Sequence, residues 1–429
     1  MASADSPDLQ GEADALHERI KRIVVVMMEN RSYDHMLGWL GPSKGGPPAG
    51  WSNPDKNGDP KYVHSTFTTA LAFDPPHGNH SSVADQVAFD PSVEGRYRMD
   101  GFVKKFEARR DGQPDWAHAD VGMVMTQYHP AAVPAYRFLA QNHLVCARYF
   151  SSVQSGTWVN RKLFYAGTSN GIIDSPEGTL IRGPEYRKHM PERLLVDLLE
   201  QKGVSWAIYA DGLAWMRLFR GNTLPVLRTP DFRRHFADHA EKGKLPQVVF
   251  VDANWDPGRD ERGNDDHIPS DVFHGQEFIR EVYNALATQP DPKGTLMVVM
   301  YDEHGGFADH VPPPPVPGWQ EDASKPNNEV FRDHGVRVPC FPASSYVEPG
   351  TVVTDPNLVF DHVSVHATIH RMFVPSMGFL DPRVAAARTL APLVTRSSPR
   401  SSWPAMPALQ RARPANPPAG QGRGSNSST

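Results

Sequence analysis

The run of six apolar residues from Ile23 to Met28 constrains the fold of this chain more than any other feature. A short apolar run rich in β-branched residues is typical of a strand that is buried on both faces of a sheet. Similar runs occupy residues 204–211, 247–254 and 295–300, and amphipathic helix patterns occupy residues 193–203, 270–287 and 361–373. Strands that alternate with helices predict an α/β fold with a central, mostly parallel sheet flanked by helices.

The two ends of the chain differ from its centre in composition. Residues 1–18 are mostly polar and indicate an N-terminal arm or a frayed helix. Residues 397–429 are rich in Ser, Pro, Gly and Arg, a composition that indicates a disordered tail. Residues 41–130 contain few helix or strand patterns and predict long loops over one edge of the sheet. We therefore expect one folded domain, residues 19–396, between two polar ends.

Charge and hydropathy exclude two classes of partner. The formal net charge is −5 and no polybasic stretch occurs, so we do not expect nucleic acid as a partner. No apolar run approaches the roughly 20 residues that a membrane-spanning helix needs. The N-terminus has no basic start followed by an apolar core, so we expect a cytoplasmic protein as written, or a secreted one if a signal has been removed. Both cysteines, Cys146 and Cys340, lie in apolar surroundings and are expected to be buried thiols.

Polar residues follow two of the predicted strands at the point where each strand ends. Glu29 and Asn30 come directly after the first strand, and Asp302 and Glu303 follow residues 295–300. Ligands of open α/β sheets bind at the carboxyl ends of the strands. Carboxylate and amide oxygens suit a hard cation such as Mg²⁺, Ca²⁺, Mn²⁺ or Fe²⁺. The alternative is that these residues cap helices and form surface ion pairs.

Three further segments carry groups that are common in catalysis. DPPHGNHSS places His77 in a proline-stiffened loop, and NDDHIPSD places Asp266 and His267 just before a helix. SSVQSGTWVNRKLF holds Thr157 just ahead of an apolar run, as a nucleophile at a helix start would be held. Each of these residues taken alone fits a solvated loop, and their joint presence is what favours an active site.

These segments together resemble the phosphoesterase family of bacterial phospholipases C, plant non-specific phospholipases C and related acid phosphatases. The stretches that carry the resemblance are MMENRSYDHMLG, DPPHGNH, YFSSVQSGTWVNRKLFYAGTS, NDDHIPSD, YDEHGGFADHVPPP and FDHVSVHATIHRMF. They occur in the family's order between about residues 22 and 375. The resemblance implies an alkaline-phosphatase-like α/β core and the hydrolysis of a phosphate ester, with a phospholipid as one option.

The resemblance also assigns roles to single residues. One divalent metal ion would be bound by the oxygens of Glu29, Asn30, Asp302 and Glu303. Thr157 would be the nucleophile that forms a phospho-enzyme intermediate, and His77 or His267 would protonate the leaving group. Substrate contacts would come from Asn160, Arg161 and His304, although an internal salt bridge is an equal alternative for Arg161.

Some features depart from the family pattern, and other functions compete with the one it implies. The prolines usual around the nucleophile are absent beside Thr157, DHIPSD replaces the more usual paired proline, and residues 204–225 lack the paired histidines of acid-phosphatase-type members. These departures leave open whether a phospholipid or a small phosphomonoester is cleaved. A G-x-S-x-G pattern surrounds Ser43, but it lies in a Gly/Pro loop and not between a strand and a helix. A non-catalytic metal- or phospholipid-binding relative and a sulfatase-like ester hydrolase remain alternatives, and the oligomeric state stays open.

Overall fold

A five-stranded sheet forms the centre of the molecule, and the first strand of the chain lies in its middle. The computed structural model describes residues 7–175, 193–220, 228–256 and 263–412. The strand order is β10-β9-β1-β8-β7, and only β10 runs antiparallel to its neighbour. The strands are β1 (Arg22–Met28), β7 (Trp206–Ala210), β8 (Val248–Asp252), β9 (Thr295–Tyr301) and β10 (Cys340–Ser344). The expected α/β fold with a mostly parallel sheet is confirmed.

β1 is a central strand because its side chains are apolar on both faces. Ile23 to Met28 are all buried, and the strand pairs in parallel with β8 on one side and β9 on the other. The register places Met28 beside Tyr301, so β1 and β9 end at the same level. The residues that follow these two strands therefore meet at one edge of the sheet.

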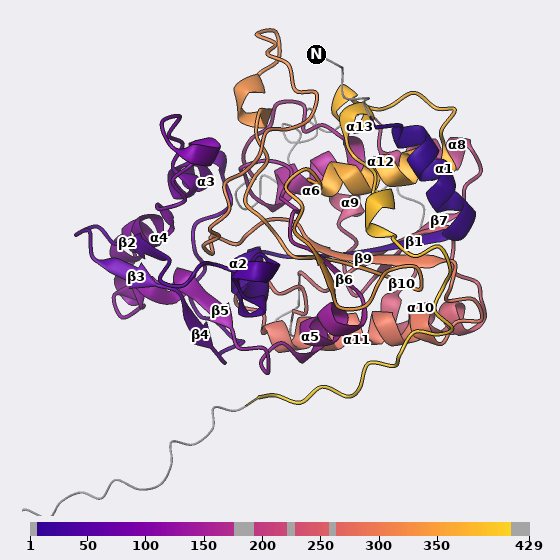
Figure 1. The fold of residues 1–429 in the computed structure, drawn as a ribbon, viewed down its shortest axis with the longest axis horizontal. Coiled ribbons are helices and arrows are strands. Elements are labelled where there is room, and N and C mark those ends of the chain that lie inside the picture. The colour runs from indigo at the N-terminus through magenta and orange to yellow at the C-terminus, as the bar shows by residue number, and fades with distance from the viewer. Residues whose placement is uncertain (1–6, 176–192, 221–227, 257–262, 413–429) are drawn as a thin grey trace, which may run out of the picture.

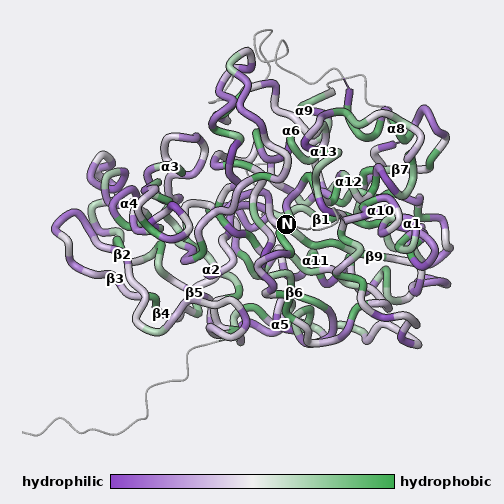
Figure 2. Tube along the Cα trace, turned by 45° about the horizontal axis from the view of Figure 1, so that its top comes forward, coloured by the Kyte–Doolittle hydropathy of each residue, from purple (hydrophilic) through white to green (hydrophobic). Residues whose placement is uncertain are grey.

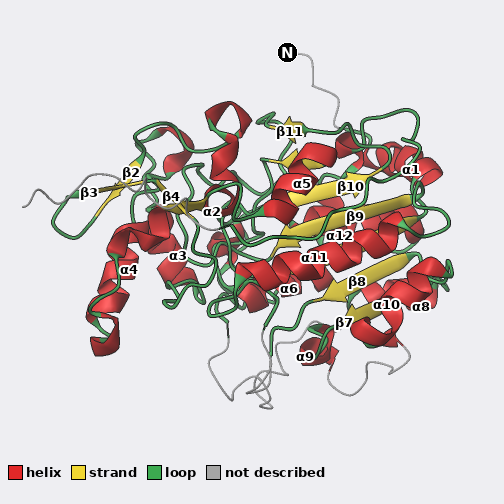
Figure 3. Cartoon of the chain, turned by 90° about the horizontal axis from the view of Figure 1, so that it is seen from below, coloured by secondary structure: helices red, strands yellow, loops and turns green. Residues whose placement is uncertain are grey.

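Helices cover both faces of the sheet, as Figure 1 shows. One face carries α1 (Leu9–Arg19), α6 (Thr157–Ala166), α8 (Leu195–Gln201) and α12 (His362–Phe373), and the other carries α5 (Pro134–Asn142), α10 (Phe232–Glu241) and α11 (Val272–Ala287). The shorter helices are α2 (Tyr33–Leu37), α9 (Met216–Arg220) and α13 (Pro382–Ala386). In Figure 1 the sheet is seen close to edge-on between these two layers, and Figure 3 shows it from the side of α5, α10 and α11, with its strands spread out as broad arrows. Figure 2 shows the hydrophobic stretches gathered around the sheet, where the largest buried apolar cluster lies.

The excursion expected at residues 41–130 contains more regular structure than the sequence indicated. It holds α3 (His80–Val87), α4 (Phe102–Asp111) and the short strands β2 (Ser52–Pro54), β3 (Pro60–Tyr62), β4 (His64–Thr66) and β5 (Thr126–Tyr128). Another two short strands, β6 (Leu144–Cys146) and β11 (Thr351–Val353), pair with each other. Val83, Phe102 and Phe106 belong to a separate buried cluster of the excursion. It projects to one side of the sheet in Figure 1.

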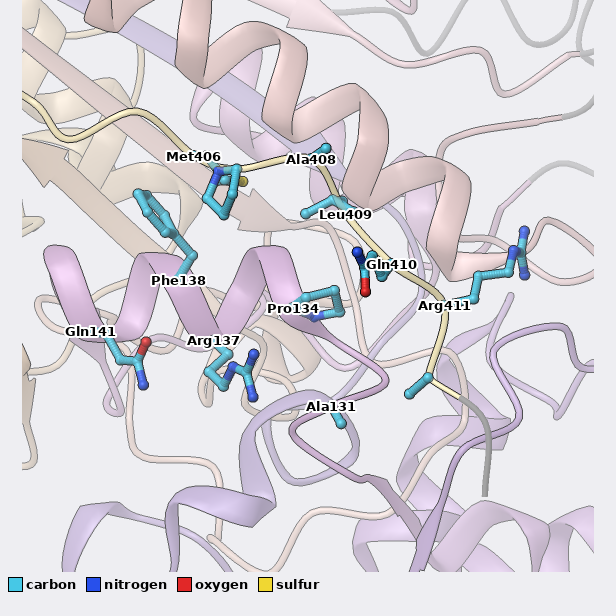
Figure 4. Close-up of a pocket in the computed structure, with 12 residues that line it drawn as sticks. Ala131, Pro134, Arg137, Phe138, Gln141, Met406, Ala408, Leu409, Gln410 and Arg411 are labelled. Carbon is cyan, nitrogen blue, oxygen red and sulfur yellow. The ribbon is translucent and has the colours of Figure 1, made fainter. Parts of the chain in front are cut away.

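The two ends of the chain pack more closely than expected. Part of the N-terminal arm is helix α1, whose Ala13 and Leu16 are buried, and α1 packs on α12. The sequence predicts a tail from residue 397, but the chain still packs on the domain beyond that point: Trp403 is 4% exposed and stacks on Tyr283. Residues 413–429 of that tail lie outside the described residues. A cavity of about 430 Å³ separates α5 from residues 406–412 (Figure 4).

Two smaller expectations concern the cysteines and the membrane. Cys146 and Cys340 are both free and buried, as expected. Among the described residues, no helix combines the length and apolar character needed to cross a membrane.

Candidate active site

The ends of β1 and β9 bring the four expected oxygen ligands together. Glu29, Asn30, Asp302 and Glu303 are all buried, with exposures of 3% or less. Two backbone hydrogen bonds join the segments: Asp302 N donates to the carbonyl of Met28, and Arg31 N donates to the carbonyl of Glu303, both at 3.1 Å. The chain directions of two parallel strands thus place two pairs of polar side chains side by side.

Each carboxylate of the β9 pair accepts backbone hydrogen bonds at one oxygen, whereas its other oxygen faces a basic side chain: Arg161 Nε lies 3.5 Å from Asp302 Oδ2, and His77 Nε2 lies 3.7 Å from Glu303 Oε1. Asp302 Oδ1 accepts hydrogen bonds from the backbone N–H groups of Asn30 and Glu303, at 3.1 and 2.7 Å. Glu303 Oε2 accepts from Gly305 N at 2.8 Å. Within the described part of the chain, Asp302 Oδ2 and Glu303 Oε1 have no hydrogen-bond partner. Two buried carboxylate oxygens are therefore held in fixed positions without a hydrogen bond, and desolvated carboxylates of this kind are stabilised by a nearby cation or by a proton.

Unusual backbone conformations allow this close approach. Asn30 has φ of 63°, a left-handed conformation that asparagine tolerates better than most residues. Gly305 has φ of 64°, and a Cβ there would lie 2.1 Å from the carbonyl oxygen of Asn30. Any side chain at position 305 would therefore push the two strand ends apart.

Thr157 is the first residue of α6 and faces this cluster. Its Oγ1 donates to Asn30 Oδ1 at 3.4 Å, and the residue is 8% exposed. An anion is favoured near the N-terminus of a helix, because the backbone N–H groups of the first turn point outward there. The hydroxyl thus lies next to the expected ligands and at a helix end that favours a phosphoryl group.

Arg161, one turn further along α6, is the cation that the structure places among the carboxylates. Its guanidinium lies 3.1 Å from Glu29 Oε1 and 3.5 Å from Asp302 Oδ2. The ring of Trp215 lies 4.3 Å from the guanidinium carbon on another side. With an exposure of 0%, Arg161 is in the internal salt bridge that was one of the two alternatives for it.

Asn160 and His304, both expected to contact substrate, make their hydrogen bonds within the protein. Asn160 is fully buried and binds the loop before α6: its Oδ1 accepts from Val153 N, and its Nδ2 donates to the carbonyl of Ser155. His304 is 1% exposed and its Nε2 pairs with Gln86 Oε1 at 2.9 Å. Asn160 thus shapes the loop that carries Thr157, and His304 links β9 to α3 of the excursion.

The two expected histidines lie on the same side of the cluster and share a carboxylate. His77 Nδ1 is 3.5 Å from Asp74 Oδ1, and His267 Nε2 is 3.6 Å from Asp74 Oδ2. His77 Nε2 pairs with Asn30 Nδ2 at 2.8 Å, and its Nδ1 pairs with the carbonyl of Pro75 at 2.6 Å. Nδ1 is thus placed to donate to the Pro75 carbonyl, and Nε2 faces the Asn30 amide. His267 differs, because its Nε2 has no hydrogen-bond partner among the described residues.

Two acidic residues of the cluster, Asp74 and Asp265, were missed in the sequence. Asp265 is 3% exposed, and its backbone carbonyl accepts a hydrogen bond from Glu29 N at 2.8 Å. Both residues belong to the stretches DPPHGNH and NDDHIPSD, so the signal was present. The sequence could not show which of two adjacent aspartates faces the site. Asp266 points the other way, and its Oδ2 accepts hydrogen bonds from Tyr136 and Tyr301.

Burial and the density of negative charge control the ionisation of these groups. Burial raises the pKa of Glu29 well above its ordinary value, opposed by Arg161 and reinforced by Asp302. Burial also raises the pKa of Glu303 to about 8, although the imidazole of His77 works against this shift. Burial alone would lower the pKa of His267, but the nearby Asp74 carboxylate raises it to about 9. A cation bound among these carboxylates would relieve the repulsion that opposes their ionisation.

The residues at the strand ends fit a divalent cation. The donor set is an amide oxygen and three carboxylates, and two of the carboxylate oxygens are buried without a hydrogen bond from the described residues. A neighbouring group consists of Glu29, Asp265 and His267, each with a donor atom within 4.8 Å of the others. A third group, Asp34, Asp309 and His310, already holds the buried guanidinium of Arg337, which lies 2.8 Å from Asp34 Oδ1 and 3.0 Å from Asp309 Oδ1. The strand-end residues are therefore a candidate set of cation ligands, within which Arg161 already contacts Glu29 and Asp302.

A family model and curated relatives match most of the length of the chain. Residues 20–374 match the model described as the Phosphoesterase family. The chain is 35% identical over 418 residues to Non-specific phospholipase C3 of Arabidopsis thaliana, a match that covers 92% of this chain and 77% of that one. It is 27% identical over 401 residues to Phospholipase C B of Mycobacterium tuberculosis, covering 82% and 73% of the two chains. A solved structure from Vibrio parahaemolyticus, a protein in the alkaline phosphatase superfamily, is similar with a TM-score of 0.36 and 11% identity, covering 92% of this chain and 80% of that one.

Proposed function

The chain belongs to the Phosphoesterase family, and from this premise we propose that it hydrolyses phosphoric esters through Thr157, with a divalent cation held by the ends of β1 and β9. Two relatives are named as phospholipases C, which supports a phospholipid substrate. The observation that carries the proposal is the position of Thr157. Its hydroxyl oxygen lies 3.4 Å from the amide oxygen of Asn30, one of the four residues that would hold the cation.

A threonine hydroxyl is a poor nucleophile unless its pKa is lowered. When bound, the cation supplies positive charge that lowers the pKa of this hydroxyl and draws electron density from the phosphoryl oxygens. Glu29, Asn30, Asp302 and Glu303 would hold it. Arg161 holds Glu29 Oε1 and Asp302 Oδ2 in place, at 3.1 and 3.5 Å.

The reaction proceeds in two displacements at phosphorus. Thr157, having lost its hydroxyl proton to solvent, forms the new O–P bond as the bond to the leaving alcohol breaks. The alcohol oxygen takes a proton from His267 Nε2. Water then attacks the phosphothreonine and gives one proton to His267, the bond between Thr157 and phosphorus breaks, and the Thr157 oxygen takes back a proton from solvent as the phosphate product leaves. His267 suits the proton transfers better than His77, because both ring nitrogens of His77 already pair with Asn30 and Pro75.

The test combines a substrate panel with trapping of the intermediate. Phosphatidylcholine vesicles, bis-p-nitrophenyl phosphate and p-nitrophenyl phosphate are each incubated with the enzyme and a divalent metal salt. We expect diacylglycerol release from phosphatidylcholine, and acid-quenched turnover should yield one phosphopeptide that contains Thr157. Thr157→Ala should lower the rate by about 10³-fold or more, and Thr157→Ser should retain part of it.

A matched control and the opposing outcomes make the test decisive. Ser43 lies exposed in the short turn Pro42–Lys44, with no strand before it, so Ser43→Ala should leave the rate unchanged. Near-full hydrolysis by Thr157→Ala would contradict a Thr157 nucleophile. Hydrolysis of a sulfate ester but of no phosphate ester would favour the sulfatase-like alternative. Binding of vesicles without any turnover would favour a non-catalytic relative.

A further inference from the structure

Asp266 is a buried carboxyl between two residues that face the site. It is 0% exposed, whereas its neighbours Asp265 and His267 direct their side chains toward Glu29. The backbone at Asp266 has φ of 77°, in the left-handed region that only a few residue types tolerate. This conformation sends the Asp266 side chain away from the site.

Three elements hold the Asp266 side chain on the far side of the loop. Its Oδ2 accepts hydrogen bonds from the hydroxyls of Tyr136, on α5, and Tyr301, the last residue of β9, at 2.8 and 2.5 Å. The two phenol oxygens also lie 2.5 Å from each other. α11 contributes Gly275, where a Cβ would lie 1.9 Å from Asp266 Oδ1. The glycine leaves the room that the carboxyl occupies.

These contacts connect the loop to the strand that carries Asp302. Tyr301 precedes Asp302 directly, and its backbone carbonyl pairs with His362 Nε2 at 2.8 Å. On the site side, His267 lies 3.7 Å from Glu29 and 3.6 Å from Asp74. A displacement of the Asp266 carboxyl would therefore move the imidazole of His267 relative to the end of β9.

We propose that Asp266 is a positioning residue for His267: clamped by Tyr136 and Tyr301, it fixes the loop so that the His267 imidazole meets the leaving-group oxygen. The inference rests on the proposed function, in which His267 protonates that oxygen. A small displacement of a group that transfers a proton lowers the reaction rate. The rate falls most for substrates whose leaving group must be protonated as it departs. Asp266 itself touches neither substrate nor cation.

The experiment compares two leaving groups in the full-length enzyme. Nitrophenolate leaves readily without a proton, whereas the alcohol released from phosphatidylcholine does not. Asp266→Ala should lower kcat for phosphatidylcholine by roughly 10- to 100-fold and kcat for bis-p-nitrophenyl phosphate by less than about threefold. KM and metal content should stay the same. Asp266→Asn keeps an oxygen that accepts from both phenols, and it should restore most of the lost rate.

Further variants separate positioning from simple loss of stability. Tyr136→Phe removes one of the two donors and should give a smaller change of the same kind, which covers the case that Asp266→Ala does not fold. Tyr283→Phe is the matched control: it removes a tyrosine hydroxyl on α11 that donates to the carbonyl of Pro404, so the ratio of the two rates should not change. Equal losses on both substrates in the Asp266→Ala and Tyr136→Phe variants would overturn the inference.

His267→Gln distinguishes a failure of the positioning role of Asp266 from a failure of the acid role of His267. If this variant changes the ratio of the two rates but the Asp266 and Tyr136 variants do not, the positioning role is wrong and the acid role of His267 stands. If His267→Gln leaves the ratio unchanged, the acid role itself is wrong, and the positioning role falls with it.

Discussion

Asp302 combines two tasks in one carboxylate, since Oδ1 accepts hydrogen bonds from backbone N–H groups and Oδ2 lies near Arg161, at 3.5 Å, without a hydrogen bond from the described residues. Asp302→Asn keeps an oxygen for the backbone and replaces Oδ2 with an amide nitrogen that cannot bind a cation. We expect cation affinity to fall by roughly 10- to 100-fold with the fold intact, measured by calorimetric titration with Mn²⁺ and by circular dichroism.

Asp309→Asn is the matched control for that variant. Asp309 is also fully buried and follows β9, but it pairs with Arg337 at 3.0 Å. Breaking a buried pair by removing one partner costs about 3–5 kcal/mol of stability. This variant should therefore unfold at a lower urea concentration than the unaltered protein and retain its cation affinity. A loss of affinity in Asp309→Asn as large as in Asp302→Asn would contradict the assigned ligand set.

Gly305 allows a second prediction for a single residue. A Cβ at this position would lie 2.1 Å from the carbonyl oxygen of Asn30, whereas Gly203, with a similar φ of 68°, has nothing within 4 Å. Gly203→Ala should lower the free energy of unfolding by only about 1–2 kcal/mol, the cost of a left-handed backbone conformation for a residue with a Cβ. Gly305→Ala should cost more and should weaken cation binding, because the ends of β1 and β9 must separate. Urea unfolding and calorimetric titration of both variants check this, and equal effects would count against it.

At the scale of single elements, Asp361 holds the start of α12. Its Oδ1 accepts from Ser364 N at 2.9 Å, and its Oδ2 accepts from Ser152 and Arg383 at 3.0 and 2.9 Å. Burial by itself would raise the pKa of Asp361, but the charges of Arg383 and His334 lower it to about 2. The carboxylate therefore stabilises the fold above its unfolded-state pKa of about 4, and this stability is lost as the pH falls from about 4 to 2.

The measurement is the pH dependence of unfolding in Asp361→Asn. At pH 7 we expect the variant to be less stable by about 2 kcal/mol, the value that a shift of that size contributes. The difference between the two proteins should shrink as the pH falls below about 4. A constant difference between pH 7 and pH 3 would show that the charge of Asp361 is not what stabilises the helix start.

The central strands β1, β7, β8 and β9 and the helices α8, α11 and α12 were predictable because their patterns are local, whereas the short elements of the excursion and the directions of single side chains were not. Glu29 and Asp302 follow strands that their apolar runs identify, so the sequence could place them at one edge of a sheet. Asn160 differs, because only the fold shows that its amide turns back to the loop before α6. The position of Asp74 depends on where the excursion packs against the sheet, and a contact between such distant parts of the chain cannot be deduced from local sequence patterns.

At the scale of the whole molecule, residues 398–412 attach to the body through Trp403. Its ring stacks on Tyr283, and its Nε1 donates to Ser345 Oγ at 3.0 Å. Tryptophan-to-alanine changes at buried sites cost about 3–5 kcal/mol. Trp403→Ala should lower the melting temperature by several degrees, measured by calorimetry, whereas Ser401→Ala at an exposed position should not change it. An unchanged melting temperature in Trp403→Ala would mean that this segment does not stabilise the domain.

The strand order also has a consequence for the ribosome-bound chain. β1 is made first, yet it lies in the middle of the sheet and pairs only with β8 and β9. Its apolar side chains have no sheet partner until residue 248 has been synthesised, and the second partner ends only at residue 301. During synthesis the nascent chain therefore carries an unpaired apolar strand with high β-propensity, which is prone to aggregation. Production of this enzyme should depend on chaperones that cover β1 until its partners emerge.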